Sequence, residues 1–301
     1  MKISSYWISE NCGLILSIVI NRQKSFHNTA PTLYLVATPI GNLKEMTPRA
    51  IEILNEVDII AAEDTRNTMK LLQAFDITTR CISHHLHNEN ESIHGIIKLL
   101  EEGKDIALVS DAGYPLISDP GEKLVNYVIE AGFNVVPVSG SSAVLNALVA
   151  SGICTQPFLF YGFLDSGEGK RTKALIELKD LPYTIIFYEA PHRIEKMLKS
   201  CLEILGNRQI CLARELTKKY EEFLRGTISE VLEVVDEIKG EMVVVIEASE
   251  KEKDIIPLSV LREKIDQYVD CGLSSKDAIK KVAKEQGISR NDLYRDYHGL
   301  N

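Results

Sequence analysis

The sequence has few cysteines, and none of them lies in a pattern typical of a metal site or a disulfide framework. Among 301 residues there are six, namely Cys12, Cys81, Cys154, Cys201, Cys211 and Cys271. No Cys-x-x-Cys pair occurs, and the clustered histidines His84, His85 and His87 lack the spacing of a zinc-binding motif. We therefore expect reduced thiols, no bound metal and a cytoplasmic protein.

A long apolar run is also missing. Residues 12–20 (CGLILSIVI) form a mostly apolar stretch of nine positions, whereas a membrane-spanning helix needs about 20. Glu10 lies where a secretory signal peptide carries no acidic residue. The sequence thus predicts no association with a membrane and a poorly structured extension over residues 1–31. A short membrane-anchoring helix within that extension is the alternative.

Positive charge is scarce. The net charge is −9 with 26% charged and 45% hydrophobic residues, which is typical of a globular protein and argues against a broad cationic coat for nucleic acid. The imbalance is uneven, because residues 32–150 carry 8 basic and 16 acidic side chains while residues 168–225 carry 12 and 9. An anionic partner should therefore prefer the second half of the chain.

The remaining pattern is an alternation of apolar, strand-like segments with amphipathic, helix-like segments. From Thr32 onward this alternation has short connections, which is typical of a parallel sheet covered by helices. It predicts an α/β domain over residues 32–152 and a second α/β domain with a mixed sheet over residues 153–249. Residues 250–301 then form a charged linker and three short helices.

Three loops rich in glycine, serine and proline follow predicted strands of the first domain. They are residues 38–43 (TPIGNL), 109–121 (VSDAGYPLISDPG) and 138–143 (VSGSSA). Loops at the carboxyl ends of parallel strands share one edge of the sheet, where such folds bind ligands. None has the Gly-x-Gly-x-x-Gly or Gly-x-x-x-x-Gly-Lys spacing of nucleotide sites. In the longest loop, Asp111 is expected to contact a ligand and Asp119 to cap the next helix.

Six segments together resemble a known family. In chain order they are LYLVATPIGNL, AAEDTRNTMKLL, ALVSDAGYPLISDPG, FYEAPHR, ARELTKKYEEFLRG and KGEMVVVIE. They resemble the motifs of the ribosomal RNA small subunit methyltransferase I family, within the tetrapyrrole-methylase fold group. The resemblance implies two α/β domains of that type with a cofactor cleft between them, plus a small C-terminal helical domain. It further implies a homodimer, bound S-adenosylmethionine, and methylation of a cytidine ribose 2′-OH in the 16S rRNA of the small ribosomal subunit.

The resemblance also implies roles for individual residues. The residues expected against the cofactor are Pro39, Gly41, Asp111, Gly113, Tyr114, Pro115, Ser141, Ser142, Ala143, Tyr188, Ala213 and Met242. The candidates for a general base are Asp64, Glu189 and Lys218, with no choice among them. The cations expected to contact RNA are Arg66, Lys170, Arg171, Arg193, Arg214, Lys218 and Arg225.

Simpler interpretations stand beside these roles. Asp64 fits equally well as a helix cap and Arg66 as its surface partner, and the basic residues near Arg214 fit a solvated face balanced by glutamates. The C-terminal helices fit a small packed bundle as well as an RNA-docking module. The alternative functions are C-methylation of a tetrapyrrole, and a non-catalytic ribosome-assembly module that keeps a ligand pocket.

Overall fold

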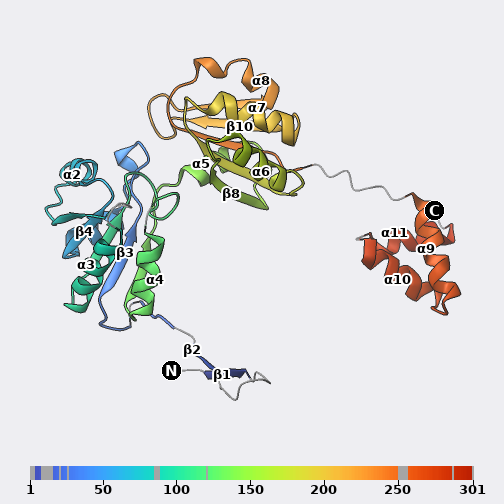
Figure 1. Ribbon diagram of the computed structural model, residues 1–301, viewed down its shortest axis with the longest axis horizontal. Helices are drawn as coiled ribbons and strands as arrows, with labels where there is room; N and C mark the ends of the chain where they lie inside the picture. Colours follow the sequence, from blue (N-terminus) through green and yellow to red (C-terminus); the bar gives the residue numbers. More distant parts are fainter. Residues whose placement is uncertain are drawn as a thin grey trace. The chain divides into compact units, whose positions relative to one another are not determined.

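The structure, a computed structural model, describes residues 4–7, 16–19, 22–25, 27–84, 89–119, 121–249, 257–286 and 288–299 (Figure 1). The chain divides into two compact units, Met1–Ser249 and Glu250–Asn301. Within the first unit lie two five-stranded sheets with helices against them. This confirms the predicted α/β class with a helical C-terminal region.

The first sheet is entirely parallel, as predicted. Its strand order is β5-β4-β6-β3-β7. The strands are β3 (Thr32–Val36), β4 (Ile59–Ala62), β5 (Cys81–Ser83), β6 (Ile106–Val109) and β7 (Asn134–Val138). The intervening helices are η1 (Leu43–Glu45), α1 (Pro48–Glu56), α2 (Thr65–Ala74), α3 (Glu89–Glu101) and α4 (Glu122–Glu130).

Alternate residues of this sheet bury on opposite faces. Ala107 and Val109 of β6 pack with α1 and α2, whereas Ile106 and Leu108 of the same strand pack with α3 and α4. This alternation with a period of two residues follows from the pleat of a strand. Because both faces are covered, the sheet presents its loops, rather than a face, to a ligand.

Helix starts in this region are largely as the sequence predicts. The Thr47 side chain accepts a hydrogen bond from the Ala50 N–H at the start of α1, and Asp64 caps α2 through the Arg66 N–H. The prediction for α4 is wrong: its N-cap is Gly121, and no side chain caps it. Asp119 therefore does not have the capping role that its position in the sequence indicated.

The second sheet is mixed, as predicted. Its order is β11-β10-β12-β9-β8, with β8 and β9 parallel and the other neighbours antiparallel. The strands are β8 (Phe158–Phe163), β9 (Thr184–Glu189), β10 (Gln209–Arg214), β11 (Glu222–Thr227) and β12 (Met242–Ile246). Strand β11 was not predicted from the sequence, because charged residues obscure its pattern.

Helices cover both faces of this second sheet. The helices of this region are α5 (Ala143–Ala150), α6 (Glu168–Leu178), α7 (Ile194–Leu205), α8 (Ile228–Leu232) and η3 (Val235–Glu237). Helices α6, α7 and α8 pack around Phe187 on one face. Helix α5 follows the first sheet in the chain but packs on the opposite face of the second, against Val243 and Val245 (Figure 1). The predicted capping box at Thr227 and Glu230 is present at the start of α8.

The segments outside the two large sheets are small. Within residues 1–31, β1 (Ser4–Trp7) and β2 (Leu16–Val19) form an antiparallel pair. The second unit contains α9 (Leu258–Asp270), α10 (Ser275–Gln286) and α11 (Arg290–His298), as predicted. Its core includes Ile265, Ile279 and Leu293. Across the described ranges, no helix has both the length and the hydropathy to cross a bilayer.

Candidate functional site

The three loops predicted to share one sheet edge meet at the carboxyl ends of β3, β6 and β7. Thr38 and Gly113 exchange two backbone hydrogen bonds, with N···O distances of 2.9 and 3.1 Å. Gly140, in the third loop, lies so close to the first that a Cβ there would come within 2.8 Å of the Ala37 Cβ. The predicted convergence is therefore confirmed, and it depends on a missing side chain at Gly140.

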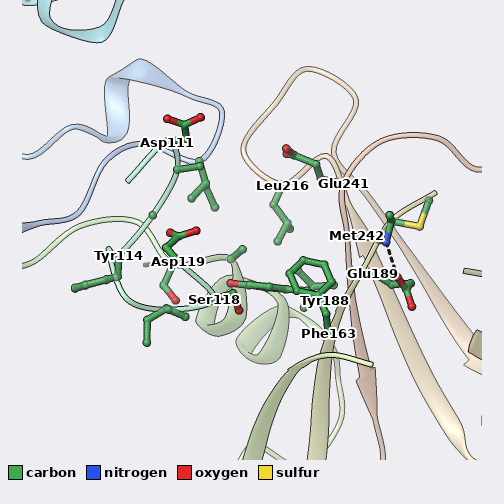
Figure 2. Close-up of a pocket in the computed structure, with 18 of the residues that line it drawn as sticks. Asp111, Tyr114, Ser118, Asp119, Phe163, Tyr188, Glu189, Leu216, Glu241 and Met242 are labelled. Carbon is green, nitrogen blue, oxygen red and sulfur yellow. Dashed lines mark hydrogen bonds between the residues drawn. The ribbon is translucent and has the colours of Figure 1, made fainter. Parts of the chain in front are cut away.

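A cavity of about 390 Å³ lies beside these loops, a size suited to a small ligand or cofactor. One wall comes from the loops of the first sheet and from α5, and the other from the strand ends of the second sheet (Figure 2). Its apolar lining includes Ile40, Phe163, Leu216 and Val243. The cavity thus joins the two α/β regions through contributions from both.

Seven of the twelve predicted cofactor residues line this cavity: Asp111, Gly113, Tyr114, Ser142, Ala143, Tyr188 and Met242. The other five, Pro39, Gly41, Pro115, Ser141 and Ala213, lie outside its wall. Ser141 donates a hydrogen bond to Glu45 at 2.8 Å, and Ala213 is buried in the core around α5. Gly41 lies against Lys218, whose Cγ would be 2.5 Å from a Cβ at that position.

The cavity is acidic. Its lining includes Asp111, Asp119, Glu189 and Glu241, and no lysine or arginine occurs among the described residues of its wall. Three of these carboxylates bond to a side-chain nitrogen: Asp111 accepts from Asn67 Nδ2 at 2.9 Å, Glu189 pairs with Arg193 at 3.0 Å, and Glu241 pairs with Lys218 at 2.7 Å. A lining of this kind favours a cation that also carries apolar surface.

Asp119 is the functional candidate that the sequence analysis missed. It lines the cavity, and burial, reinforced by the nearby charges of Glu63 and Asp111, raises the pKa of its carboxyl group to about 6, against an opposing hydrogen bond with Ser110. The sequence holds one signal, since the Asp-Pro-Gly segment ends a loop far longer than a strand-to-helix link requires. Aspartate is common at helix starts, so local rules place Asp119 there instead.

Tyr188 faces Asp119 from the opposite wall (Figure 2). Burial, together with the charge of Asp119, raises the pKa of its phenol to about 12, although a hydrogen bond from the Val144 backbone acts in the opposite direction. The side chain therefore stays neutral at physiological pH. Its ring packs edge-on against Phe160, with centroids 4.9 Å apart, which fixes its position in the wall.

The three candidates for a general base differ in their surroundings. Asp64 lies outside the cavity lining, and hydrogen bonds from Arg66 hold the pKa of its carboxyl group at about 2. Burial lowers the pKa of Lys218, but its hydrogen bonds to Glu241 and Glu215 raise it overall, so the amine stays protonated. Glu189 is in the wall, and burial raises its pKa despite the Ala190 N–H and Arg193. Its Oε2 atom is buried without a hydrogen-bond partner among the described residues.

The cations predicted to contact RNA fall into two groups. Arg66 and Lys170 present their side chains to solvent, with exposed fractions of 86% and 82%. Lys218 is partly exposed and lies against Gly41 of the first loop. These three side chains can contact an anionic partner while they remain close to the acidic residues with which they pair.

The other four have partners within the fold. Arg171 is buried and donates to Ser200 and to the Ser166 carbonyl. Arg225 donates to the carbonyls of Ala150 and Ser151 at the end of α5, where a cation is favourable. Arg193 bonds to Glu189 and the Leu164 carbonyl, and Arg214 to Glu222. These contacts favour structural roles for Arg171 and Arg225 in particular.

Comparison with known proteins agrees with this architecture. The family described as Tetrapyrrole (Corrin/Porphyrin) Methylases matches residues 32–232. A Bacillus subtilis protein named ribosomal RNA small subunit methyltransferase I is 48% identical over 289 residues, covering 93% of this chain and 99% of that protein. A Synechocystis protein of the same name is 45% identical over 87% of this chain and 96% of its own length. The chain belongs to the ribosomal RNA small subunit methyltransferase I family.

Solved structures extend the likeness at the level of fold. A cobalt precorrin-4 methyltransferase superposes with a TM-score of 0.56 at 15% identity, covering 72% of this chain and 94% of that one. A diphthine synthase gives 0.55 at 11%, covering 72% and 89%. Members of the ribosomal RNA small subunit methyltransferase I family thus share a fold with enzymes whose names indicate different acceptors, so the acceptor must be argued from the site.

Proposed function

We propose that the protein transfers a methyl group from S-adenosylmethionine to the ribose 2′-oxygen of a cytidine in 16S rRNA of the small ribosomal subunit. The observation that carries this proposal is the acidic cavity, whose described lining holds four carboxylates and no cationic side chain. The names of the relatives support the rRNA acceptor. A homodimer acting in the cytoplasm is part of the same proposal.

The residues of the cavity fit such a donor. A sulfonium and an ammonium group carry positive charge that can be offset by Asp111 and by the Oε2 atom of Glu189, which has no hydrogen-bond partner among the described residues. Apolar side chains such as Leu216 and Met242 can pack on an adenine ring. When bound, the donor supplies an electrophilic methyl carbon whose leaving group is a neutral thioether.

The chain's own contribution is positioning in a site protected from water. The loops after β3, β6 and β7 are tied together by backbone bonds and a close contact at Gly140, so the wall of the first sheet is pre-organised. The segment after β10 brings Leu216 into the cavity and Lys218 against Gly41. This contact joins the two α/β regions beside the cavity.

Transfer of a labelled methyl group tests the proposal. Purified protein with radiolabelled S-adenosylmethionine and 30S subunits from a strain lacking the enzyme should label 16S rRNA at one cytidine. Nuclease digestion and mass spectrometry should locate the methyl on the ribose. Two parallel reactions, with a porphyrinoid acceptor and with no acceptor, serve as controls. Label found only on the porphyrinoid, or no label with measured donor binding, would contradict the proposed acceptor.

A further inference from the structure

Asp119 differs from the other carboxylates of the cavity in its partners. Asp111, Glu189 and Glu241 are held by Asn67, Arg193 and Lys218. Over the described residues, no basic side chain forms an ion pair with Asp119, and the hydroxyl of Ser110 is the hydrogen-bond partner that affects its titration. Burial therefore raises the proton affinity of this carboxylate, and no basic partner among the described residues opposes the effect.

The loop segment that leads to Asp119 contains two residues with unusual backbone angles. Leu116 has a φ of 74° and Ser118 a φ of 67°, both in a region that side chains other than glycine seldom adopt. Gly121, two residues later, has a φ of 128°. Strain of this kind is maintained at functional sites. In this segment Asp119 does not cap α4, and it lines the cavity wall instead.

We propose that Asp119 is the general base that accepts the proton of the attacking hydroxyl group. This inference rests on the proposed methyl transfer and identifies the group that acts within it. Asp119, from the loop after β6, and Tyr188, from β9, line the same cavity from its two walls (Figure 2), close enough that the charge of Asp119 acts on the Tyr188 phenol. An acceptor oxygen placed between them would reach a base on one side and a neutral hydroxyl on the other.

The step balances without a further reactant. As the ribose oxygen forms its bond to the methyl carbon, the carbon–sulfur bond breaks and its electron pair remains on sulfur as a thioether. The hydroxyl proton moves to an Oδ atom of Asp119, which becomes a neutral carboxylic acid. That acid then loses its proton to solvent when the product leaves. The site ends the cycle with its original charge.

The groups that face Asp119 keep it suited to this role. Burial raises its proton affinity, and the charges of Glu63 and Asp111 raise it further. His84 and Ser110 line a small pocket behind the loop together with Asp119. Tyr188 approaches from the second sheet. The raised pKa of about 6 leaves Asp119 ionised at neutral pH, yet makes it a stronger base than Asp64, whose pKa is about 2.

Single-turnover methyl transfer to 30S subunits, measured from pH 5 to 8.5, tests the role. We expect the wild-type rate to rise tenfold per pH unit below about 6 and to level off above. Asp119→Asn should lower the plateau about 100-fold or more, the range general bases contribute, and abolish the acidic limb. Asp119→Glu should restore part of the rate and the limb. Glu122→Gln changes an exposed carboxylate three residues away and should match the wild type.

Calorimetry with the donor and with its demethylated product gives a readout independent of turnover. Both affinities should change by less than about twofold in Asp119→Asn. If Asp119→Asn weakened binding of the charged donor but not of the product, Asp119 would contact the sulfonium, and the proposal would be overturned. So would an intact acidic limb in Asp119→Asn, or its disappearance in Glu189→Gln instead. A wild-type protein that binds donor but transfers no methyl group to 30S subunits would refute the proposed function itself.

Discussion

The two large sheets contribute to the cavity in different ways. The first is parallel and fully covered by helices, so its contribution comes from loops beyond the strand ends, such as the segment around Gly113. The second is mixed, and its strands reach the cavity directly, through Tyr188 and Glu189 of β9 and Met242 and Val243 of β12. The first wall is therefore rich in backbone and small residues, and the second in fixed side chains.

Unusual backbone conformations therefore occur in the loops of the first sheet, and dense side-chain packing occurs behind the strands of the second. The loops of the first sheet hold unusual backbone angles at Leu116 and Ser118 and a close approach at Gly140. The strands of the second sheet are anchored in a dense core that includes Phe187. We expect changes to the cavity-lining side chains of the loops to affect the ligand more than the fold, whereas changes at the close backbone approach of Gly140 or behind the strands should affect the fold first.

The largest change in stability is expected in the core of the second sheet, behind the cavity wall that this sheet forms. Phe187 is 0% exposed, and Phe187→Ala should lower the free energy of unfolding by about 3–5 kcal/mol through lost burial and a cavity. Phe163→Ala, at a cavity-lining side chain that is 51% exposed, is the matched control and should cost less than about 1 kcal/mol. Urea unfolding of both variants measures this. Equal losses would contradict the proposed difference between the core and the wall.

The next effect concerns the close approach in the loops of the first sheet. Gly140→Ala would place a Cβ 2.8 Å from that of Ala37 and 3.0 Å from its carbonyl oxygen, and should destabilise the protein by about 1–3 kcal/mol. Gly95 lies in α3, where an added Cβ would meet no atom within 4 Å. Gly95→Ala should instead stabilise by about 0.5–1 kcal/mol. Thermal unfolding distinguishes the two, and a harmless Gly140→Ala would show that the contact with Ala37 is not a tight one.

A smaller effect is expected for ligand contact in the same wall. Asp111→Ala should weaken binding of S-adenosylmethionine about tenfold, or about 1.4 kcal/mol, because a cavity carboxylate is lost. The unfolding midpoint should stay close to that of the wild type, since Asp111 is exposed. Asn67→Ala, which removes the partner of Asp111 at 2.9 Å, is the control for the hydrogen bond alone. Unchanged affinity in titration calorimetry would exclude Asp111 from the site.

The smallest effect is a pH-dependent gain in stability. The pKa of Asp119 is raised from 3.8 to about 6 in the folded protein, so between these values the folded chain binds more protons than the unfolded chain. Its contribution to stability therefore falls as pH rises from about 4 to about 6. Asp119→Asn should raise the free energy of unfolding by about 1 kcal/mol or less at pH 7.5, because solvent screening reduces the effect of a partly exposed group. It should gain nothing below pH 4. Thermal scans at both pH values test this, and a loss at pH 7.5 would contradict it.

Much of the fold follows from local sequence. The alternation from Thr32 predicts the parallel sheet, and the caps at Thr47, Asp64 and Thr227 occur as expected because each depends on bonds within a few residues. β11 was missed because it pairs only with β10 and carries charged residues such as Glu222 and Arg225. Its place in the sheet depends on a long-range partner that no local pattern encodes.

The site was predictable only in part, for a related reason. Glycine-rich loops after strands indicate a ligand edge, and the residues Gly113, Ser142 and Ala143 that they contain line the cavity. The role of a titratable side chain depends instead on its neighbours in space. Local rules place Asp119 at a helix start, and the family resemblance implies RNA contact for Arg171, although the structure buries Arg171 beside Ser200.

The sequence by itself determined the alternating elements, the loops that end the parallel strands and the family, because these depend on local periodicity, turn chemistry and contiguous motifs. Only the tertiary structure decided which carboxylates share the cavity and which of them have a basic partner. Proton affinity is set by burial and by charges brought together from distant segments. For Asp119, burial is the larger cause, and the charges come from the carboxylates of Glu63 and Asp111.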